Sequence, residues 1–235
     1  MNKYELTKVI EEFAPVETQE SWDCSGWIAD NFDCMDVKKI MLALTPNKKI
    51  LTQARTQGCD MIISHHPMFF IERDFFGGFK PDMNMYCAHT NFDKANGGTT
   101  DIIIDKLGLT NHKIDIEHEF LRFVDIKISV NDLNKPIAQN FKNARIINNN
   151  NTTIVSRIAF CAGSGSDFIE ESADLGADCL VTGDVKYHCA VDSKIVLYDI
   201  GHFQSEIICL EKFKEILAPY VETVVAQEID PFVLL

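Results

Sequence analysis

The histidines of this chain are concentrated where apolar runs end. Five of the seven lie in four short polar segments: SHHP (His65 and His66), HTNFD (His89, with Asp93), KYH (His188) and HFQSE (His202, with Glu206). Imidazole nitrogens and carboxylate oxygens are the donors that Zn, Mn, Fe and Ni ions accept in proteins. The pattern therefore indicates a metal site of imidazoles and carboxylates, whereas no cysteine is placed for a structural thiolate site.

Each segment has a simpler explanation when it is taken alone. Adjacent strand residues point to opposite faces, so His65 and His66 converge only if the chain bends, which Pro67 favours by keeping His66 out of the α region. A His–Glu pair four residues apart on a helix is most often a solvated surface pair, and HTNFD can be an Asx-type turn. His188 can act as a general acid–base group or support a ligand, or it can be a core histidine.

The metal interpretation depends on the segments acting together. Two ions need about seven or eight donor atoms, and a bridging carboxylate reduces the number of side chains required. We therefore predict two divalent ions per chain (Zn, Fe, Mn or Ni) with water at the open positions. The predicted ligands are His65, His66, Asp93, His202 and Glu206.

The elements that must position these residues alternate between strand and helix, which predicts an α/β protein with mainly parallel or mixed sheets. Apolar runs predict strands at 38–44, 61–64, 86–89, 123–130, 154–161, 179–182, 195–198 and 221–226. Helical spacing predicts helices at 3–13, 49–57, 99–107, 168–175 and 203–217. The asparagine-rich stretch 140–153 is predicted to be a solvated turn.

One sequence pattern recurs half a chain later. QARTQGCDMIIS and EESADLGADCLVT both show a helix, a Gly-x-Asp turn and a buried strand, with Gly58 and Asp60 matching Gly176 and Asp178. The recurrence predicts two related αβ modules with the metal site at strand ends between them, although so common a pattern can also recur by chance. The predicted modules are residues 1–110 with 195–235, and residues 111–194.

Composition limits the possible partners and surroundings of the chain. Its 235 residues are 46% hydrophobic and carry a net charge of −13, which disfavours binding to nucleic acid or an anionic membrane. No apolar run is long enough to span a bilayer, and the first residues do not form a secretory signal. The eight cysteines include no C-x-x-C pair. We expect reduced thiols and a cytoplasmic location.

Four motifs in this order resemble the Ngg1-interacting-factor-3-like family: SHHPMFF, AHTNFDKANGG, TGDVKYH and GHFQSE. SWDCSGW and DPF near the two ends fit the same pattern, so the resemblance spans nearly the whole chain. Bacterial members of the family are often labelled GTP cyclohydrolase I type 2 homologues. The resemblance implies two αβ units around a dinuclear metal centre, and a toroidal hexamer with the metals facing an internal cavity. Family ligands fall on the five residues predicted above.

The chain departs from the family pattern at positions that bear on the substrate. Relatives commonly have a carboxylate after the first strand, where this chain reads LTPN (44–47), and WDN becomes WDC (22–24). Cys189 replaces an aspartate that often follows the motif histidine. The segment from Phe69 to Phe79 is rich in phenylalanine and predicts either an interface between subunits or a small satellite core.

Three functions are compatible with these residues. The first is a metal-dependent hydrolase acting on a small molecule, which for relatives of this label is GTP, with opening of the purine ring. The second is a protein that stores, delivers or senses a metal without catalysis. The third is an interaction scaffold with structural metals. No P-loop occurs in the sequence, so a nucleotide would be held through metals or scattered side chains.

Overall fold

The computed structural model describes residues 1–68 and 82–232. The described chain forms two compact α/β units and passes between them at 98/99, 208/209 and 229/230. Unit 1 comprises residues 1–98 and 209–229, and unit 2 comprises residues 99–208 and those from 230 onward. The phenylalanine-rich segment 69–79, which carries the interface prediction, lies outside the described residues.

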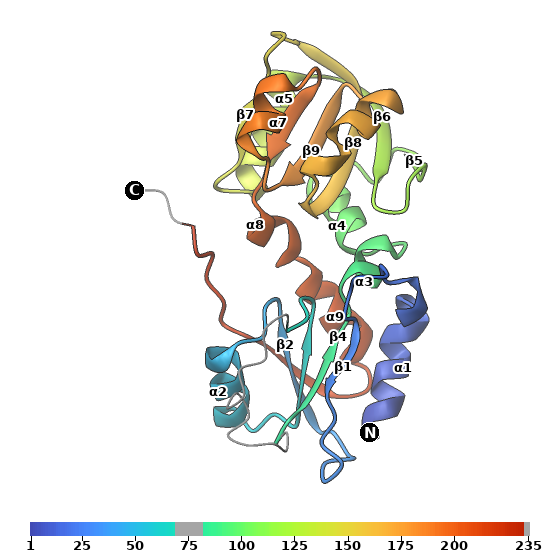
Figure 1. Cartoon of the computed structure of the whole chain (residues 1–235), viewed down its shortest axis with the longest axis vertical. Helices are drawn as coiled ribbons and strands as arrows, with labels where there is room; N and C mark the ends of the chain where they lie inside the picture. Colours follow the sequence, from blue (N-terminus) through green and yellow to red (C-terminus); the bar gives the residue numbers. More distant parts are fainter. Residues whose placement is uncertain (69–81, 233–235) are drawn as a thin grey trace. The chain divides into compact units, whose positions relative to one another are not determined.

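Unit 1 is built on a five-stranded sheet of order β1-β4-β3-β2-β11. β1 is antiparallel to β4, and the other four strands are parallel. Helix α2 covers one face of the sheet, and α1 and α9 cover the other (Figure 1). The elements are α1 (Lys3–Phe13), η1 (Val16–Thr18), β1 (Gly26–Ala29), β2 (Lys39–Ala43), α2 (Lys48–Thr56), β3 (Met61–Ser64), β4 (Asn84–Cys87), α3 (Thr90–Lys94), α9 (Cys209–Leu217) and β11 (Glu222–Val225).

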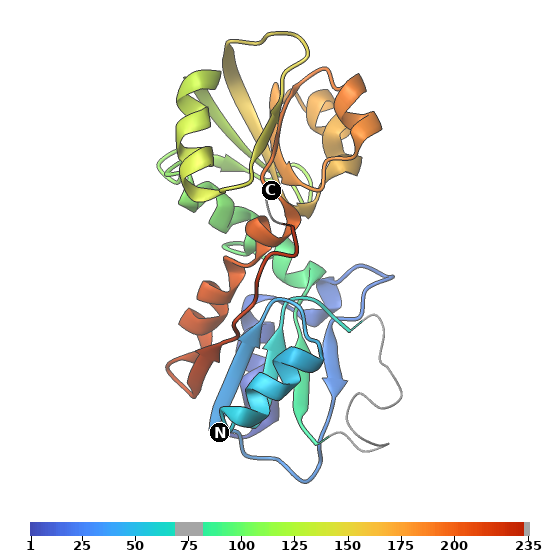
Figure 2. The ribbon, with the colours of Figure 1, turned by 90° about the vertical axis from the view of Figure 1, so that its left-hand side faces the viewer.

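Unit 2 is built on a six-stranded sheet of order β5-β6-β8-β9-β10-β7. The central strands β8, β9 and β10 are parallel, and the outer pairings are antiparallel. Figure 2 shows α5 on one face of this sheet and α6 and α7 on the other. The elements are α4 (Thr99–Lys106), β5 (Ile114–Asp115), β6 (Arg122–Ser129), α5 (Val130–Asn140), β7 (Arg145–Ile147), β8 (Ile154–Ser164), η2 (Ser166–Phe168), α6 (Ile169–Asp174), β9 (Cys179–Gly183), α7 (Tyr187–Asp192), β10 (Val196–Asp199) and α8 (His202–Glu206).

The mixed α/β class is confirmed, and burial explains why the apolar runs mark the strands. Strands β2, β3, β9 and β10 are buried almost throughout because helices cover both faces of each sheet. The unit boundaries differ from the predicted modules: residues 99–110 and 195–208 lie in unit 2. β10 pairs with β9 and β7, and α4 contributes Ile103 and Ile104 to the core of that unit.

Two local predictions were wrong, and several elements, α5 among them, were not predicted. The stretch 140–153 contains the short edge strand β7, which pairs with β10 but is largely exposed and therefore carries no apolar signal. Helix α5 was missed because Pro136 lies inside it, although Ser129 caps its start by accepting a hydrogen bond from the Asp132 amide. The helix predicted at 203–217 is two helices, α8 and α9, which belong to different units.

The recurring sequence pattern corresponds to a recurring geometry. Ile40 on β2 lies opposite Met61 on β3, and Ile158 on β8 lies opposite Cys179 on β9. The loop glycines have positive φ angles in both copies, +66° at residue 58 and +86° at residue 176. In each copy the aspartate two residues later accepts hydrogen bonds from two backbone amides of the neighbouring strand region. Asp60 accepts from the amides of residues 38 and 39, and Asp178 accepts from those of residues 156 and 157. The two segments are therefore similar in structure as well as in sequence.

No helix in the described ranges, 1–68 and 82–232, has the length and apolar character needed to cross a membrane.

Candidate metal centre

In unit 1, three histidines converge at the carboxyl ends of two neighbouring parallel strands. His65 and His66 follow β3, and His89 follows β4, which pairs with β3. The ligand nitrogens of the three rings all lie within 4.8 Å of one another. Three imidazoles at this spacing can bind one divalent ion.

The adjacent histidines face the same region because the chain bends between them. The His65 amide continues the pairing of β3 with β2 through the Ala43 carbonyl, so His65 stays in the sheet and is fully buried. The Ser64 hydroxyl donates to the His66 carbonyl at 2.8 Å and holds the turn. The two ring centroids are consequently 5.2 Å apart, and the alternation of a regular strand no longer applies.

Each of these three rings has its Nδ1 atom engaged by a neighbouring group. His65 Nδ1 lies 3.1 Å from the Ala88 carbonyl, which can only accept, so this nitrogen carries the proton. His66 Nδ1 lies 2.8 Å from the Thr45 hydroxyl. His89 Nδ1 lies 2.9 Å from an Asp23 carboxylate oxygen. Nε2 is therefore the nitrogen of each ring that can act as a ligand, an arrangement typical of metal-binding histidines.

Asp93 is brought to this cluster by the short helix α3. Its Oδ1 atom lies 3.5 Å from His65 Nε2, and only 8% of the residue is exposed. The preceding residue, Phe92, anchors the helix by stacking on Phe213 of α9 at a centroid distance of 4.3 Å. The HTNFD segment thus begins a short helix, not an isolated Asx-type turn, and Asp93 stays a predicted ligand.

In unit 2, His202 and Glu206 form a close pair on α8. His202 Nε2 lies 2.9 Å from Glu206 Oε2, and the other ring nitrogen, Nδ1, lies 2.8 Å from Asp184 Oδ2. Glu206 is only 3% exposed, which excludes the alternative of a solvated surface pair. Burial opposes the charge on His202, but the hydrogen bonds and charges of Glu206 and Asp184 outweigh it and raise the pKa of His202 to about 9 in the metal-free protein.

The backbone around this pair has no room for side chains. A Cβ atom added to Gly163 on β8 would lie 2.2 Å from Glu206 Oε1, and this glycine has a φ angle of +63°. Asp184 itself adopts a φ angle of +53°, which is uncommon for a residue other than glycine. Backbone strain of this kind is common at functional sites, and here it falls on the aspartate that contacts His202.

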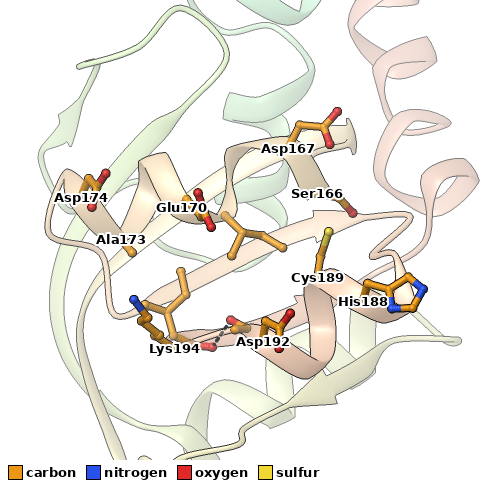
Figure 3. Close-up of a pocket in the computed structure, with 12 residues that line it drawn as sticks. Ser166, Asp167, Glu170, Ala173, Asp174, His188, Cys189, Asp192 and Lys194 are labelled. Carbon is orange, nitrogen blue, oxygen red and sulfur yellow. Dashed lines mark hydrogen bonds between the residues drawn. The ribbon is translucent and has the colours of Figure 1, made fainter.

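His188 lies elsewhere in unit 2, on α7. It is exposed rather than buried, so the alternative of a core histidine is excluded. Together with Cys189 it borders a pocket of about 570 Å³ between η2, α6 and α7, shown in Figure 3. Its ring centroid lies 5.5 Å from that of the neighbouring Tyr187. Its predicted acid–base role stays a prediction.

Three carboxylates that form hydrogen bonds around the site were not predicted from the sequence. Asp23 and Asp184 lie inside the quoted motifs SWDCSGW and TGDVKYH, so their motif positions were the available signal. Glu228 had no such signal: it accepts hydrogen bonds from the amides of Leu44 at 2.5 Å and Thr45 at 2.9 Å. It therefore places a carboxylate at the end of β2, where the LTPN stretch lacks one.

The donor set fits a divalent transition metal, because it combines imidazole nitrogens with carboxylates that are buried or nearly so. Fold and residues thus define an α/β protein with a candidate metal centre at strand ends. Comparison with known proteins agrees with the α/β fold. The sequence matches the Duf34/NIF3 (NGG1p interacting factor 3) family over residues 1–231, and the chain belongs to that family.

Individual relatives cover the full length of the chain. A Clostridium perfringens protein named GTP cyclohydrolase 1 type 2 homolog is 32% identical over 261 aligned positions, which cover 99% of both chains. The solved structure titled reduced HcgD from Methanocaldococcus jannaschii has a TM-score of 0.82 at 25% identity and covers 96% of this chain and 97% of its own. A structure titled protein ybgI, unknown function, has a TM-score of 0.87 at 21% identity, covers 99% of this chain and 100% of its own, and supports the fold alone.

Proposed function

We propose that this protein is a metal-dependent hydrolase with two divalent ions per chain, and that its substrate is a small molecule of the nucleotide class. The ligands proposed are those predicted from the sequence: His65, His66, Asp93, His202 and Glu206. The observation that carries the proposal is the fixed orientation of the imidazoles. The Nδ1 atoms of His65, His66 and His202 each lie within hydrogen-bonding distance of a carbonyl, a hydroxyl or a carboxylate. The Nε2 atom of each ring is then the nitrogen that can bind a metal ion.

We propose further that the donors of the two units belong to one dinuclear centre. Chain connectivity supports this part of the proposal. Glu206 is three residues before Cys209, which belongs to unit 1, and Asp93 is six residues before Thr99, which belongs to unit 2.

Divalent ions held there would polarise a scissile bond and lower the pKa of a water molecule. The residues of this chain contribute the position and the charge. Glu206 and Asp93 are the two carboxylates of the proposed ligand set, and Glu206 would be the carboxylate shared by the two ions. Asp184, Thr45 and the Ala88 carbonyl prevent the histidine rings from rotating away.

The nucleotide substrate is proposed from the names of relatives, several of which are called GTP cyclohydrolase 1 type 2 homolog. If that name applies, the reaction is hydrolytic opening of the purine ring of GTP. His188 is the proposed acid–base group because its exposed imidazole can exchange protons with a bound molecule. The proposed homo-oligomer, a hexamer, would enclose the centre and admit only small molecules.

Turnover of GTP by the metal-reconstituted protein tests the function. We expect product with the wild type, none with His66→Ala, and wild-type turnover with His112→Ala, which removes a histidine outside the centre. Metal binding without turnover of GTP or other nucleotides would reject the hydrolase and favour a storage, delivery or sensing protein. Metal ions whose coordination positions are all filled by protein side chains would instead favour the interaction scaffold with structural metals.

A further inference from the structure

We propose that the pocket between η2, α6 and α7 of unit 2 binds a polyamine, an aliphatic chain that carries separated ammonium groups. The pocket has a volume of about 570 Å³, which is the size of a small-molecule site. The residues that line it all lie within 166–195 of unit 2. The inference therefore uses contacts within one unit and does not rest on the proposed metal centre.

The floor of the pocket is apolar and is fixed by the core of the unit. Ile169 and Ala173 are four residues apart, so they lie on one face of α6. Ile169 is 7% exposed and belongs to a core cluster formed with β9 and β10, and Cys189 and Ile195 pack against the same cluster. A floor anchored in this way is formed before a ligand arrives, and it offers an apolar surface to methylene groups.

The asparagine run 148–151 holds another wall of the pocket in place. The side-chain nitrogen of Asn149 lies 2.9, 3.1 and 3.2 Å from the carbonyl oxygens of residues 190, 191 and 193. The Asn150 side chain donates to the Lys194 carbonyl at 2.9 Å. These carbonyls lie at the end of α7 and just after it, where a helix leaves acceptors without partners. The run predicted as a solvated turn therefore fixes the end of α7 and the segment that leads to β10.

Carboxylates give the pocket a negative charge. Four of them line it: Asp167, Glu170, Asp174 and Asp192. Among the lining residues that the structure describes, the ammonium group of Lys194 opposes them. Asp167 is paired with Lys186 at 2.9 Å, whereas the other three carboxylates have no ion-pair partner within residues 1–68 and 82–232. A pocket with this charge attracts a cation and repels phosphate groups.

The placement of the carboxylates suits a long cation better than a metal ion. In the described chain, the groups of donor atoms close enough to hold an ion contain no residue of this pocket. Glu170 and Asp192 instead come from α6 and α7, the two helices that wall the pocket (Figure 3). A polyamine matches both features of the site. Its ammonium groups can pair with carboxylates from separate walls, and its methylene groups can cover the floor, as the stem of a lysine covers apolar surface.

Calorimetry with spermidine as the titrant tests the inference. We expect the wild type to bind one spermidine per chain at physiological salt. The double variant Glu170→Gln/Asp192→Asn should weaken binding roughly tenfold, the combined effect of losing two exposed ion pairs. Ala173→Met should also weaken binding, because the longer side chain fills the floor while the charge stays the same. Unchanged affinity in both of these proteins would reject the pocket.

The matched control is the double variant Glu171→Gln/Asp105→Asn. It removes the same number of charges from α6 and α4 of unit 2, at positions that do not line the pocket, and should leave the affinity unchanged. An equal loss in both double variants would mean general attraction between charges and would reject the site. Displacement of spermidine by an equal concentration of Mg²⁺ would mean a site for any cation and would reject the polyamine.

Amide chemical shifts locate the bound spermidine. They should change at 166–174 and 188–195, and changes confined to the proposed metal ligands would overturn the inference. Binding should persist in His66→Ala, which disables the proposed metal centre, so failure of that centre and failure of this pocket give different results. No variant in the test alters His188, the proposed acid–base group. The absence of saturable spermidine binding in the wild type would reject the inference outright.

Discussion

At the scale of single residues, the orientation of imidazole rings is what distinguishes this site from a chance cluster of polar side chains. His65 donates to a carbonyl, and His89 and His202 contact carboxylates. Each contact involves the Nδ1 atom of the ring, so Nε2 is the nitrogen that can bind a metal ion. Residue types and positions predicted five ligands, whereas the groups that contact the rings were not predicted, because they lie on other segments of the chain.

The pair of His202 and Glu206 makes the stability of the metal-free protein depend on pH. The pKa of His202 is raised from 6.5 to about 9 in the folded state, so its contribution to stability is complete below pH 6.5 and is lost as the pH rises toward 9. Urea unfolding in the presence of a chelator should show the wild type losing stability across this range. Glu206→Gln should lose less, and an equal decline in both proteins would contradict the assignment.

Gly163→Ala tests how tightly Glu206 is confined. The new Cβ would lie 2.2 Å from Glu206 Oε1, at a backbone position with a φ angle of +63°. We expect the carboxylate to be displaced and the strand strained, at a cost of about 1–3 kcal/mol in the free energy of unfolding. Metal content should fall as well. Gly176→Ala is the control, since its φ angle is also positive, +86°, but its nearest neighbour is an Arg157 side-chain atom at 3.9 Å. It should lower stability without affecting the metal.

At the scale of elements, the strands were the most predictable part of the fold. Runs such as KIMLA (39–43) and CLVTG (179–183) are buried on both faces, so their continuous apolar character identifies them without knowledge of their neighbours. β7 is exposed and three residues long, and it exists because β10 offers an open edge. Such an element depends on tertiary pairing, which local sequence does not encode.

The recurring Gly-x-Asp turn gives a prediction at this scale. Asp60 and Asp178 each satisfy two strand amides, so replacing either by alanine should lower the free energy of unfolding by about 1–3 kcal/mol. Denaturant titration measures the effect, with Asp105→Ala on the exposed face of α4 as the control. A large loss for one aspartate and none for the other would show that the two turns are not equivalent.

At the scale of the whole molecule, the predicted ligands are divided between two units whose boundaries fall close to them in sequence. The order of the motifs predicted which residues would be ligands. It did not predict that 195–208 would belong to unit 2, because that assignment follows from the pairing of β10 with β9. Composition constrains the assembly only weakly, and the proposed hexamer depends mainly on the family resemblance.

The oligomeric state is directly measurable. Several large apolar side chains are exposed in the described chain, including Trp22 at 63%, Phe32 at 72% and Phe232 at 75%, and such residues are common at subunit interfaces. Light scattering at micromolar concentration should give about six times the chain mass of 26.6 kDa. A monomer mass would reject the assembly and with it the enclosed cavity.

Elemental analysis of protein purified without chelator tests the central claim, that this chain holds two divalent metal ions. We predict about two equivalents of transition metal per chain in the wild type. Glu206→Ala should lose much of this metal, because a bridging carboxylate serves both ions, and His112→Ala should lose none. Less than one equivalent in the wild type, or unchanged content in Glu206→Ala, would contradict the dinuclear centre.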